Sequence, residues 1–187
     1  LLGGEGDDSL TGARSNDIRG EAGNDALTVD IVNPHTGTSS VAGGEGDDVI
    51  RVTAAIGTDN TEAGSAEVRG DAGADTFDLE FTLSDTAIVT DGPTTLQSGA
   101  NLRIMDYDAS GDMIQIEILR PEGEAPRAIS DTSFARDEDE DGLGPYTDVT
   151  LTFAGTDTLT EVTSVFRIYS ATVITAADLD IVVTPVS

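Results

Sequence analysis

The chain has 187 residues, of which 36 are acidic and nine basic, and its formal net charge is −27. That length suits one domain, or one elongated repeat structure with a cap, and the charge argues against nucleic acid and anionic membranes as partners because both need clustered cations. Because the chain has no cysteine and no apolar run of about 18 residues, we expect no disulfide, no thiolate zinc site and no membrane insertion.

A nine-residue pattern, Gly-Gly-x-Gly-x-Asp-x-U-x with U a large apolar residue, occurs at residues 3–11 and 43–51 and, without its second glycine, at 20–28 and 70–78. We number its positions one to nine. The glycines permit turns that aim backbone carbonyls inward, the aspartate at position six supplies a carboxylate, and the last three residues predict a short strand. The apolar position predicts a stacked core ladder of Leu10, Leu27, Ile50 and Phe77.

The spacing of the copies is irregular. Asp8, Asp25, Asp48 and Asp75 follow one another at steps of 17, 23 and 27 residues. The residues between the copies include enlarged turns at 33–39 and 57–64. We therefore expect all four glycine-rich turns on one edge of the fold and ordinary loops on the opposite edge. Because Leu1-Leu2 fits the end of a further repeat, we also expect the chain to be a fragment of a larger protein.

After Phe77 the pattern changes to longer β-strands. Alternating or β-branched apolar runs predict strands at 77–83, 87–90, 102–105, 113–119, 148–154 and 165–183, the last with a break. A short helical turn is expected at 175–179. The sequence therefore predicts an all-β fold.

The four copies resemble the RTX (hemolysin-type) calcium-binding repeats. This resemblance implies a right-handed parallel β-roll solenoid over residues 1–83, followed by a β-rich, sandwich-like cap and secretion region over 84–187 that is continuous with the roll. Residues 104–116 resemble the capping segment of serralysin-like proteases and of the repeat modules of mannuronan epimerases. Residues 173–183 resemble the tail that addresses such proteins to a type I exporter.

The resemblance also implies ligands, because in this family one Ca²⁺ ion is shared by two adjacent turns. The first ion would contact Gly4, Gly6 and Asp8 together with Gly20, Ala22 and Asp25. The second would contact Glu21, Gly23 and Asp25 together with Gly43, Glu45 and Asp48. The third would contact Gly44, Gly46 and Asp48 together with Gly70, Ala72 and Asp75. A fourth would be closed by Asp106 or Asp108 with Asp71, Gly73 and Asp75. The alternative is that the enlarged turns break the stacking and leave the turns without metal.

A different calcium pattern lies at 137–148. Asp137, Asp139 and Asp141 occupy loop positions one, three and five, Gly142 follows at six, and Asp148 stands at twelve. This is the ligand spacing of an EF-hand-like loop, although no helices flank it. The alternative is a solvated acidic hairpin tip. Residues 106–117 fit the same template with Glu117 at twelve, but the alternation of 113–118 favours a strand and hence the capping segment.

No catalytic motif is present, and His35, the only histidine, lies in a polar loop sequence. We therefore expect a secreted, non-enzymatic module that binds about three to five Ca²⁺ ions and folds on binding them after type I secretion. Two alternatives are a carbohydrate-binding accessory module, which predicts an exposed arginine or aromatic groove, and an adhesin or surface-layer segment that self-associates.

Overall fold

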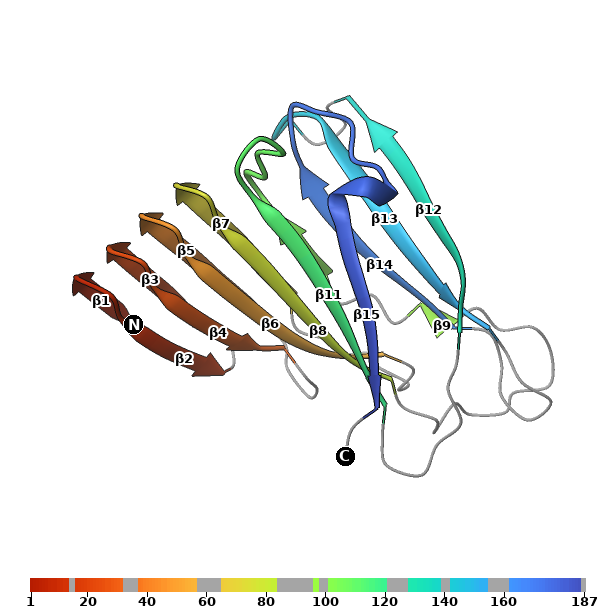
Figure 1. The fold of residues 1–187 in the computed structure, drawn as a ribbon, viewed down its shortest axis with the longest axis horizontal. Helices are drawn as coiled ribbons and strands as arrows, with labels where there is room; N and C mark the ends of the chain where they lie inside the picture. Colours follow the sequence, from red (N-terminus) through yellow and green to blue (C-terminus); the bar gives the residue numbers. More distant parts are fainter. Residues whose placement is uncertain are drawn as a thin grey trace.

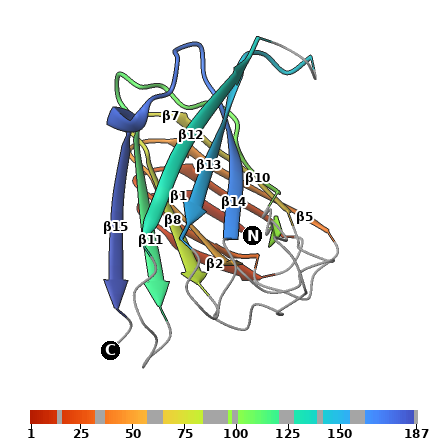
Figure 2. The ribbon, with the colours of Figure 1, turned by 90° about the vertical axis from the view of Figure 1, so that its right-hand side faces the viewer.

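The computed structural model describes residues 1–13, 16–31, 37–56, 65–83, 96–97, 101–120, 128–138, 142–154 and 162–185. In these residues the regular structure is almost entirely β-strand, in two sheets that face each other (Figures 1 and 2). A single 3-10 turn, Ala176–Asp178, is the only helical element of the described chain. It follows that none of the described helical structure is long and apolar enough to cross a membrane.

The two sheets are built mainly from parallel strands. Sheet A has the order β1 (Leu2–Glu5), β3 (Asp17–Ala22), β5 (Thr38–Glu45), β7 (Ser65–Ala72), β10 (Asn101–Ile104), β14 (Val162–Tyr169), β13 (Tyr146–Phe153) and β12 (Ile129–Asp137), and β9 (Leu96–Gln97) pairs with β14. Sheet B has the order β15 (Leu179–Pro185), β11 (Met113–Arg120), β8 (Thr76–Leu83), β6 (Val49–Ile56), β4 (Ala26–Asp30) and β2 (Ser9–Ala13). Only the pairs β12/β13 and β13/β14 are antiparallel.

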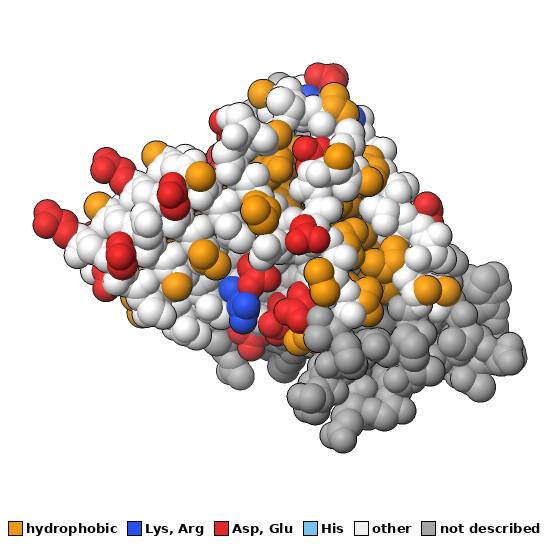
Figure 3. Space-filling model, in the orientation of Figure 1, with side chains coloured by type: hydrophobic (Ala, Val, Ile, Leu, Met, Phe, Trp, Pro, Cys, Tyr) orange, Lys and Arg blue, Asp and Glu red, His pale blue; other side chains and the backbone are white. Residues whose placement is uncertain are grey.

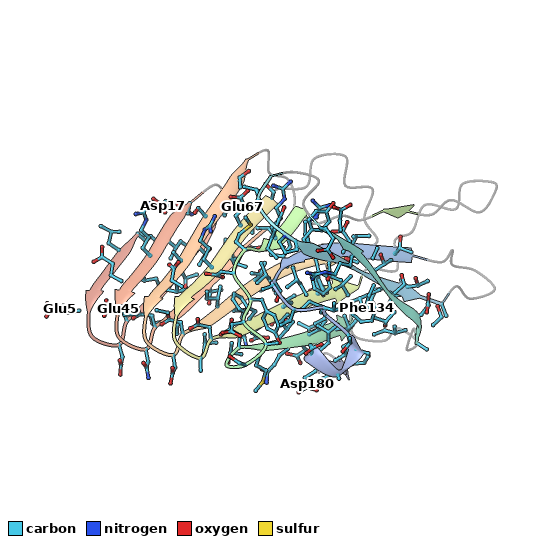
Figure 4. All side chains as sticks on the ribbon, turned by 90° about the horizontal axis from the view of Figure 1, so that it is seen from above. Glu5, Asp17, Glu45, Glu67, Phe134 and Asp180 are labelled. Carbon is cyan, nitrogen blue, oxygen red and sulfur yellow. The ribbon has the colours of Figure 1, made fainter. Side chains whose placement is uncertain are left out.

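The chain alternates between the two sheets through residue 83. Each glycine-rich turn leads from a strand of sheet A to the next strand of sheet B, as in β1 to β2 and β3 to β4. All four turns therefore lie on the same edge, which we call the turn edge (Figure 4). This agrees with the predicted placement of the glycine-rich turns. The enlarged turns predicted at 33–39 and 57–64 lie mostly or wholly outside the described residues.

The core lies between the sheets and is stacked as expected. Leu10, Leu27, Ile50 and Phe77 are register partners on neighbouring strands of sheet B, and Ile114 of β11 continues the row. All of them are fully buried except Leu10, which is partly buried at the end of the stack. Sheet A faces this row with Ile18, Val41, Val68 and Ile104, all fully buried. The alternation of buried and exposed residues along each strand follows from the two-residue period of a β-strand.

Both sheets continue past residue 83 without interruption. The pairs β7/β10 and β8/β11 are parallel, and β15 then extends sheet B while β14, β13 and β12 extend sheet A. The final strands thus share the two sheets of the first part of the chain. Thr175 caps the 3-10 turn by accepting a hydrogen bond from the amide of Ala177, in agreement with the turn predicted at 175–179.

The strand predictions agree with the structure at 77–83, 102–105, 113–119, 148–154 and 165–183 to within about three residues at each boundary, with the break lying between β14 and β15. The strand predicted at 87–90 lies outside the described residues. The sequence did not predict β12. That strand alternates only weakly because polar residues occupy most of it and it lies at the sheet's end.

Candidate metal-binding turns

The aspartates at motif position six form a ladder along the turn edge. The amide of Asp8 donates to Asp25 Oδ1 at 2.8 Å, that of Asp25 to Asp48 Oδ1 at 2.7 Å, and that of Asp48 to Asp75 Oδ1 at 2.9 Å. Asp112 adds a fifth member, because the Asp75 amide donates to its Oδ1 at 3.0 Å. Each carboxylate after the first therefore has one oxygen fixed by the backbone of the preceding turn.

The second carboxylate oxygen, Oδ2, lacks such a hydrogen bond in two of these aspartates. Asp25 Oδ2 and Asp48 Oδ2 are buried and accept no hydrogen bond. A buried carboxylate oxygen without a donor is costly unless a cation satisfies it. Two oxygens without a donor in the heart of the turn stack are thus an arrangement that suits a metal ion.

The glycine at motif position one makes room for this second oxygen. A Cβ on Gly20 would collide with Asp25 Oδ2 and with the carbonyl oxygen of Gly43 in the next turn. A Cβ on Gly43 would meet Asp48 Oδ2 and the Gly70 carbonyl oxygen in the same way. A carboxylate oxygen and a carbonyl oxygen therefore crowd the same small space beside each glycine.

The same crowding shifts the pKa values of two buried aspartates upward. Burial raises the pKa of Asp48 above its ordinary value, and the charge of Asp25 adds to the shift. Burial, together with the charges of the neighbouring carboxylates of Asp112, Asp48 and Asp106, raises the pKa of Asp75 to about 6. Both shifts mean that the charged form lacks compensation, which a bound divalent cation would supply.

A second ladder runs along the rim of the turns at motif position five. The side-chain oxygen of Asp7 accepts from the Asn24 amide at 2.9 Å, Asn24 Oδ1 from the Asp47 amide at 3.0 Å, and Asp47 Oδ1 from the Ala74 amide at 2.9 Å. All four residues are exposed. In this ladder the earlier turn supplies the acceptor, whereas in the aspartate ladder the later turn does. The sequence analysis missed it, although three of the four copies carry Asp or Asn at position five.

Backbone hydrogen bonds join the turns as well. The amides of Gly6, Gly23 and Gly46 donate to the carbonyls of Ala22, Glu45 and Ala72 at 2.7 to 2.8 Å. These three carbonyls belong to the predicted ligand sets and keep a second lone pair. The register places Gly4 beside Glu21, Glu21 beside Gly44 and Gly44 beside Asp71. The structure thus brings each predicted pair of turns together.

The fourth predicted ion falls at residues 105–112, and here the structure changes the assignment of side chains. Asp106 accepts hydrogen bonds from the amides of Gly70 and Asp71, at 3.0 and 2.9 Å, so it caps the start of the fourth copy. Asp108 is exposed and accepts from the amide of Ser110 in its own turn. The residue that reaches Asp75 is Asp112, which the sequence analysis did not include. In the sequence, Asp112 stands two residues before a large apolar residue at the start of a buried strand, as Asp75 does, and this shared order could have identified it.

The acidic loop at 137–148 is only partly described. Asp137 ends β12, and Asp139 and Asp141 lie outside the described residues. Asp148 lies within β13, where its two carboxylate oxygens accept from Arg167 at 2.7 and 3.0 Å. The Arg167 guanidinium also lies 3.5 Å from the centre of the Tyr146 ring. The residue at position twelve of the predicted loop therefore already has a cation as its partner.

Among the described residues, no three His, Cys, Asp or Glu side chains converge so that they would hold a metal ion by themselves. Each pair of adjacent turns contributes two aspartates, so an ion between turns would need backbone carbonyls to complete its coordination. Comparisons with protein-family models, with curated proteins and with solved structures give no match.

Proposed function

We propose that this chain is a secreted calcium-binding module of the RTX type, with its repeats wound as a right-handed parallel β-roll and no catalytic role. The observation that carries the proposal is the pair of buried, unpartnered oxygens, Asp25 Oδ2 and Asp48 Oδ2, in the middle of the turn stack. Calcium prefers six to eight hard oxygen ligands, and carboxylates with backbone carbonyls meet that preference.

The ligand sets follow from adjacent turns. One ion between the first two turns would be held by Asp8 and Asp25, a second by Asp25 and Asp48, and a third by Asp48 and Asp75, each with carbonyls of positions one to four. Asp75 and Asp112, with Asp106 nearby, offer a fourth pair of carboxylates. The irregular steps between copies do not weaken this proposal, because the turn-to-turn hydrogen bonds keep lengths of 2.7 to 3.0 Å throughout.

The proposed mechanism is a folding switch. Without metal, the net charge of −27 and the buried aspartates oppose compaction, which suits passage through a type I exporter. At millimolar extracellular calcium, each site would stabilise the folded chain by about 1.4 to 2.7 kcal/mol when the ion exceeds its dissociation constant ten- to hundredfold. Several sites together approach the whole stability of a small domain.

Calcium titration followed by far-ultraviolet circular dichroism, with calorimetry for stoichiometry and magnesium as control, tests the proposal. We expect β signal to appear with calcium at about three to five ions per chain. The double variant Asp25→Asn/Asp48→Asn should bind fewer ions. Asp7→Asn/Asp47→Asn is the matched control, because it removes two charges from the same edge at exposed positions and keeps both acceptor oxygens. A chain that folds fully in chelator and binds no ion contradicts the proposal.

A further inference from the structure

The outer face of sheet A carries a trough that the proposed calcium sites do not use. Its floor is the outward row of β5, namely Ser40, Ala42 and Gly44. Its walls are the outward rows of the strands on either side, Asp17, Arg19 and Glu21 on β3 and Glu67, Arg69 and Asp71 on β7. The register pairs these residues across the sheet, with Asp17 beside Ser40 beside Glu67, Arg19 beside Ala42 beside Arg69, and Glu21 beside Gly44 beside Asp71. Along both walls, an acidic residue, an arginine and a second acidic residue therefore follow one another at paired register positions.

The small floor residues leave a real hollow between these walls. Its volume is about 360 Å³, and Arg19, Glu21, Arg69 and Asp71 line its sides. The walls stand two strand spacings apart, or about 10 Å, and the outward row of five residues is about 13 Å long. A hollow of this volume lies at the lower end of the range of small-ligand sites. Asp17 and Glu67, labelled in Figure 4, point outward from this sheet, away from the core.

The wall side chains differ in whether they already have a hydrogen-bond or ion-pair partner. Arg19 donates to both carboxylate oxygens of Asp17 at 3.1 Å, and Glu67 pairs with Arg103 at 3.5 Å. The Arg69 side chain is exposed and makes no hydrogen bond or ion pair with any described residue, although its charge partly offsets the rise that burial causes in the pKa of Asp106. The hollow thus offers an unpaired guanidinium on one wall, with carboxylates of Glu21 and Asp71 at the next level of both walls. Figure 3 has the orientation of Figure 1, in which β11 and β15 of sheet B lie in front. The trough on the outer face of sheet A is therefore on the far side of that view.

The backbone adds an independent argument that these carboxylates have a role. Glu21 and Asp71 stand at motif position two with φ of 81° and 67°, the only non-glycine residues of the described chain in the left-handed region. The same position holds Gly4 and Gly44 in the other two copies, with φ of 113° and 122°. A side chain in this conformation strains the backbone, because its Cβ crowds the following carbonyl oxygen. A backbone carbonyl offered to calcium would serve as well from glycine, so the calcium proposal does not explain the two carboxylates.

We propose that this trough binds a neutral glycan, held by hydrogen bonds from its hydroxyl groups to Arg69, Glu21 and Asp71. A hydroxyl group both donates and accepts, so it matches walls that alternate acceptor, donor and acceptor. A polyanion would face four wall carboxylates on a chain of net charge −27, and a polycation would face two arginines. Charge complementarity therefore favours an uncharged polyol. The proposal does not rest on calcium binding at the turn edge.

An array of neutral oligosaccharides, probed with the calcium-loaded full chain, tests the proposal, followed by calorimetry on the best-retained glycan. We expect Arg69→Ala to weaken binding about tenfold or more, since it removes a charged hydrogen-bond donor. Glu21→Gly and Asp71→Gly should weaken it similarly while keeping or raising the unfolding temperature, because both relieve a left-handed backbone.

Arg51→Ala is the matched control. Arg51 is an exposed arginine paired with Asp78 and Glu80 on the outer face of sheet B, so it changes the net charge equally without touching the trough. Polygalacturonate and chitosan oligomers supply the anionic and cationic comparisons. Retention of no neutral glycan, a preference for either charged polymer, or an equal loss in Arg51→Ala and Arg69→Ala would each overturn the proposal. If the parent chain binds a neutral glycan but binds no calcium, the calcium proposal alone is contradicted.

Discussion

The backbone amide of Asp25 donates a hydrogen bond to Oδ1 of Asp48, 23 residues later in the chain, at 2.7 Å. The same carboxylate keeps its other oxygen, Oδ2, buried and without a partner. The two oxygens of one side chain therefore have separate tasks. One fixes the distance between turns, and the other is left for an ion, so a substitution that preserves the first while changing the second can tell the two apart.

Asp48→Asn makes this distinction. The amide oxygen can still accept from Asp25, and the new NH₂ group can donate toward the Gly70 carbonyl that crowds the same space. We expect the variant to be more stable than the parent in chelator, by about 1 kcal/mol, and to gain less stability from calcium. The residual β signal in chelator, followed by circular dichroism, measures the first effect, and urea unfolding in saturating calcium measures the second. A variant that gains as much from calcium as the parent would argue against a ligand role for Asp48.

The stability of the metal-free protein should fall as the pH rises. Burial raises the pKa of Asp75 from 3.8 to about 6 in the folded state, so the folded chain holds this proton more tightly than the unfolded chain. Its contribution is complete below 3.8 and is lost as the pH rises through about 6. We expect a loss of about 1–3 kcal/mol across that window. The difference between the parent and Asp75→Asn in the folded fraction, followed by circular dichroism in chelator at each pH, isolates it, and saturating calcium should diminish it. A difference that does not vary with pH would contradict this prediction.

Gly73 and Gly6 stand at the same motif position but should respond differently to alanine. Both have positive φ, 150° and 100°, but a Cβ on Gly73 would collide with the Gly46 carbonyl of the preceding turn, whereas a Cβ on Gly6 meets nothing within 4 Å. We expect Gly73→Ala to destabilise by about 3 kcal/mol or more and Gly6→Ala by about 1 kcal/mol. Chemical unfolding in calcium compares them. Equal costs would mean that the turns are not stacked as the structure has them.

Thr147 offers a stabilising substitution. Its hydroxyl oxygen is buried in the core side of β13 and has no hydrogen-bond partner, and the residue is 1% exposed. Thr147→Val replaces the hydroxyl by a methyl group of similar size, so we expect a gain of about 1 kcal/mol in the free energy of unfolding. Thr150→Val, on the outward row of the same strand, is the control and should change stability by less than about 0.5 kcal/mol. Destabilisation by Thr147→Val would show that the hydroxyl has a partner in solution.

The sequence predicted the parts of the fold that repeat. The nine-residue pattern carries both the turn and its apolar residue, so the row from Leu10 to Phe77 and the common turn edge could be inferred from it. Asp112 was missed because the residues before it lack the glycine pattern, although it takes the same place in the aspartate ladder as Asp75. Asp148 was predicted as a loop ligand from spacing alone, whereas its partner, Arg167, comes from the next strand along the chain.

The trough could not be predicted from the sequence for a related reason. Asp17, Arg19 and Glu21 alternate along one strand, as do Glu67, Arg69 and Asp71 along another, and each triplet taken alone is an ordinary solvated strand face. Their alignment depends on the register of β3 and β7 against β5. With copies spaced at 23 and 27 residues, only the stacked turns fix that register. The pairing of side chains across a parallel sheet is a property of the packed chain.

The two ladders give the stack of turns a polarity. From Asp25 to Asp75, each position-six carboxylate accepts from the amide of the earlier turn. The position-five side chains of Asp7, Asn24 and Asp47 accept from the amide of the later turn. Asp112 supplies the last acceptor, to the amide of Asp75, and its own turn closes on itself through the bond from the Asp108 amide. The two ends of the stack of turns therefore differ in the hydrogen-bonding groups that they present. The turns from Asp8 to Asp75 are joined by one repeated set of bonds, whereas the turn of Asp112 ends the set with a bond of its own.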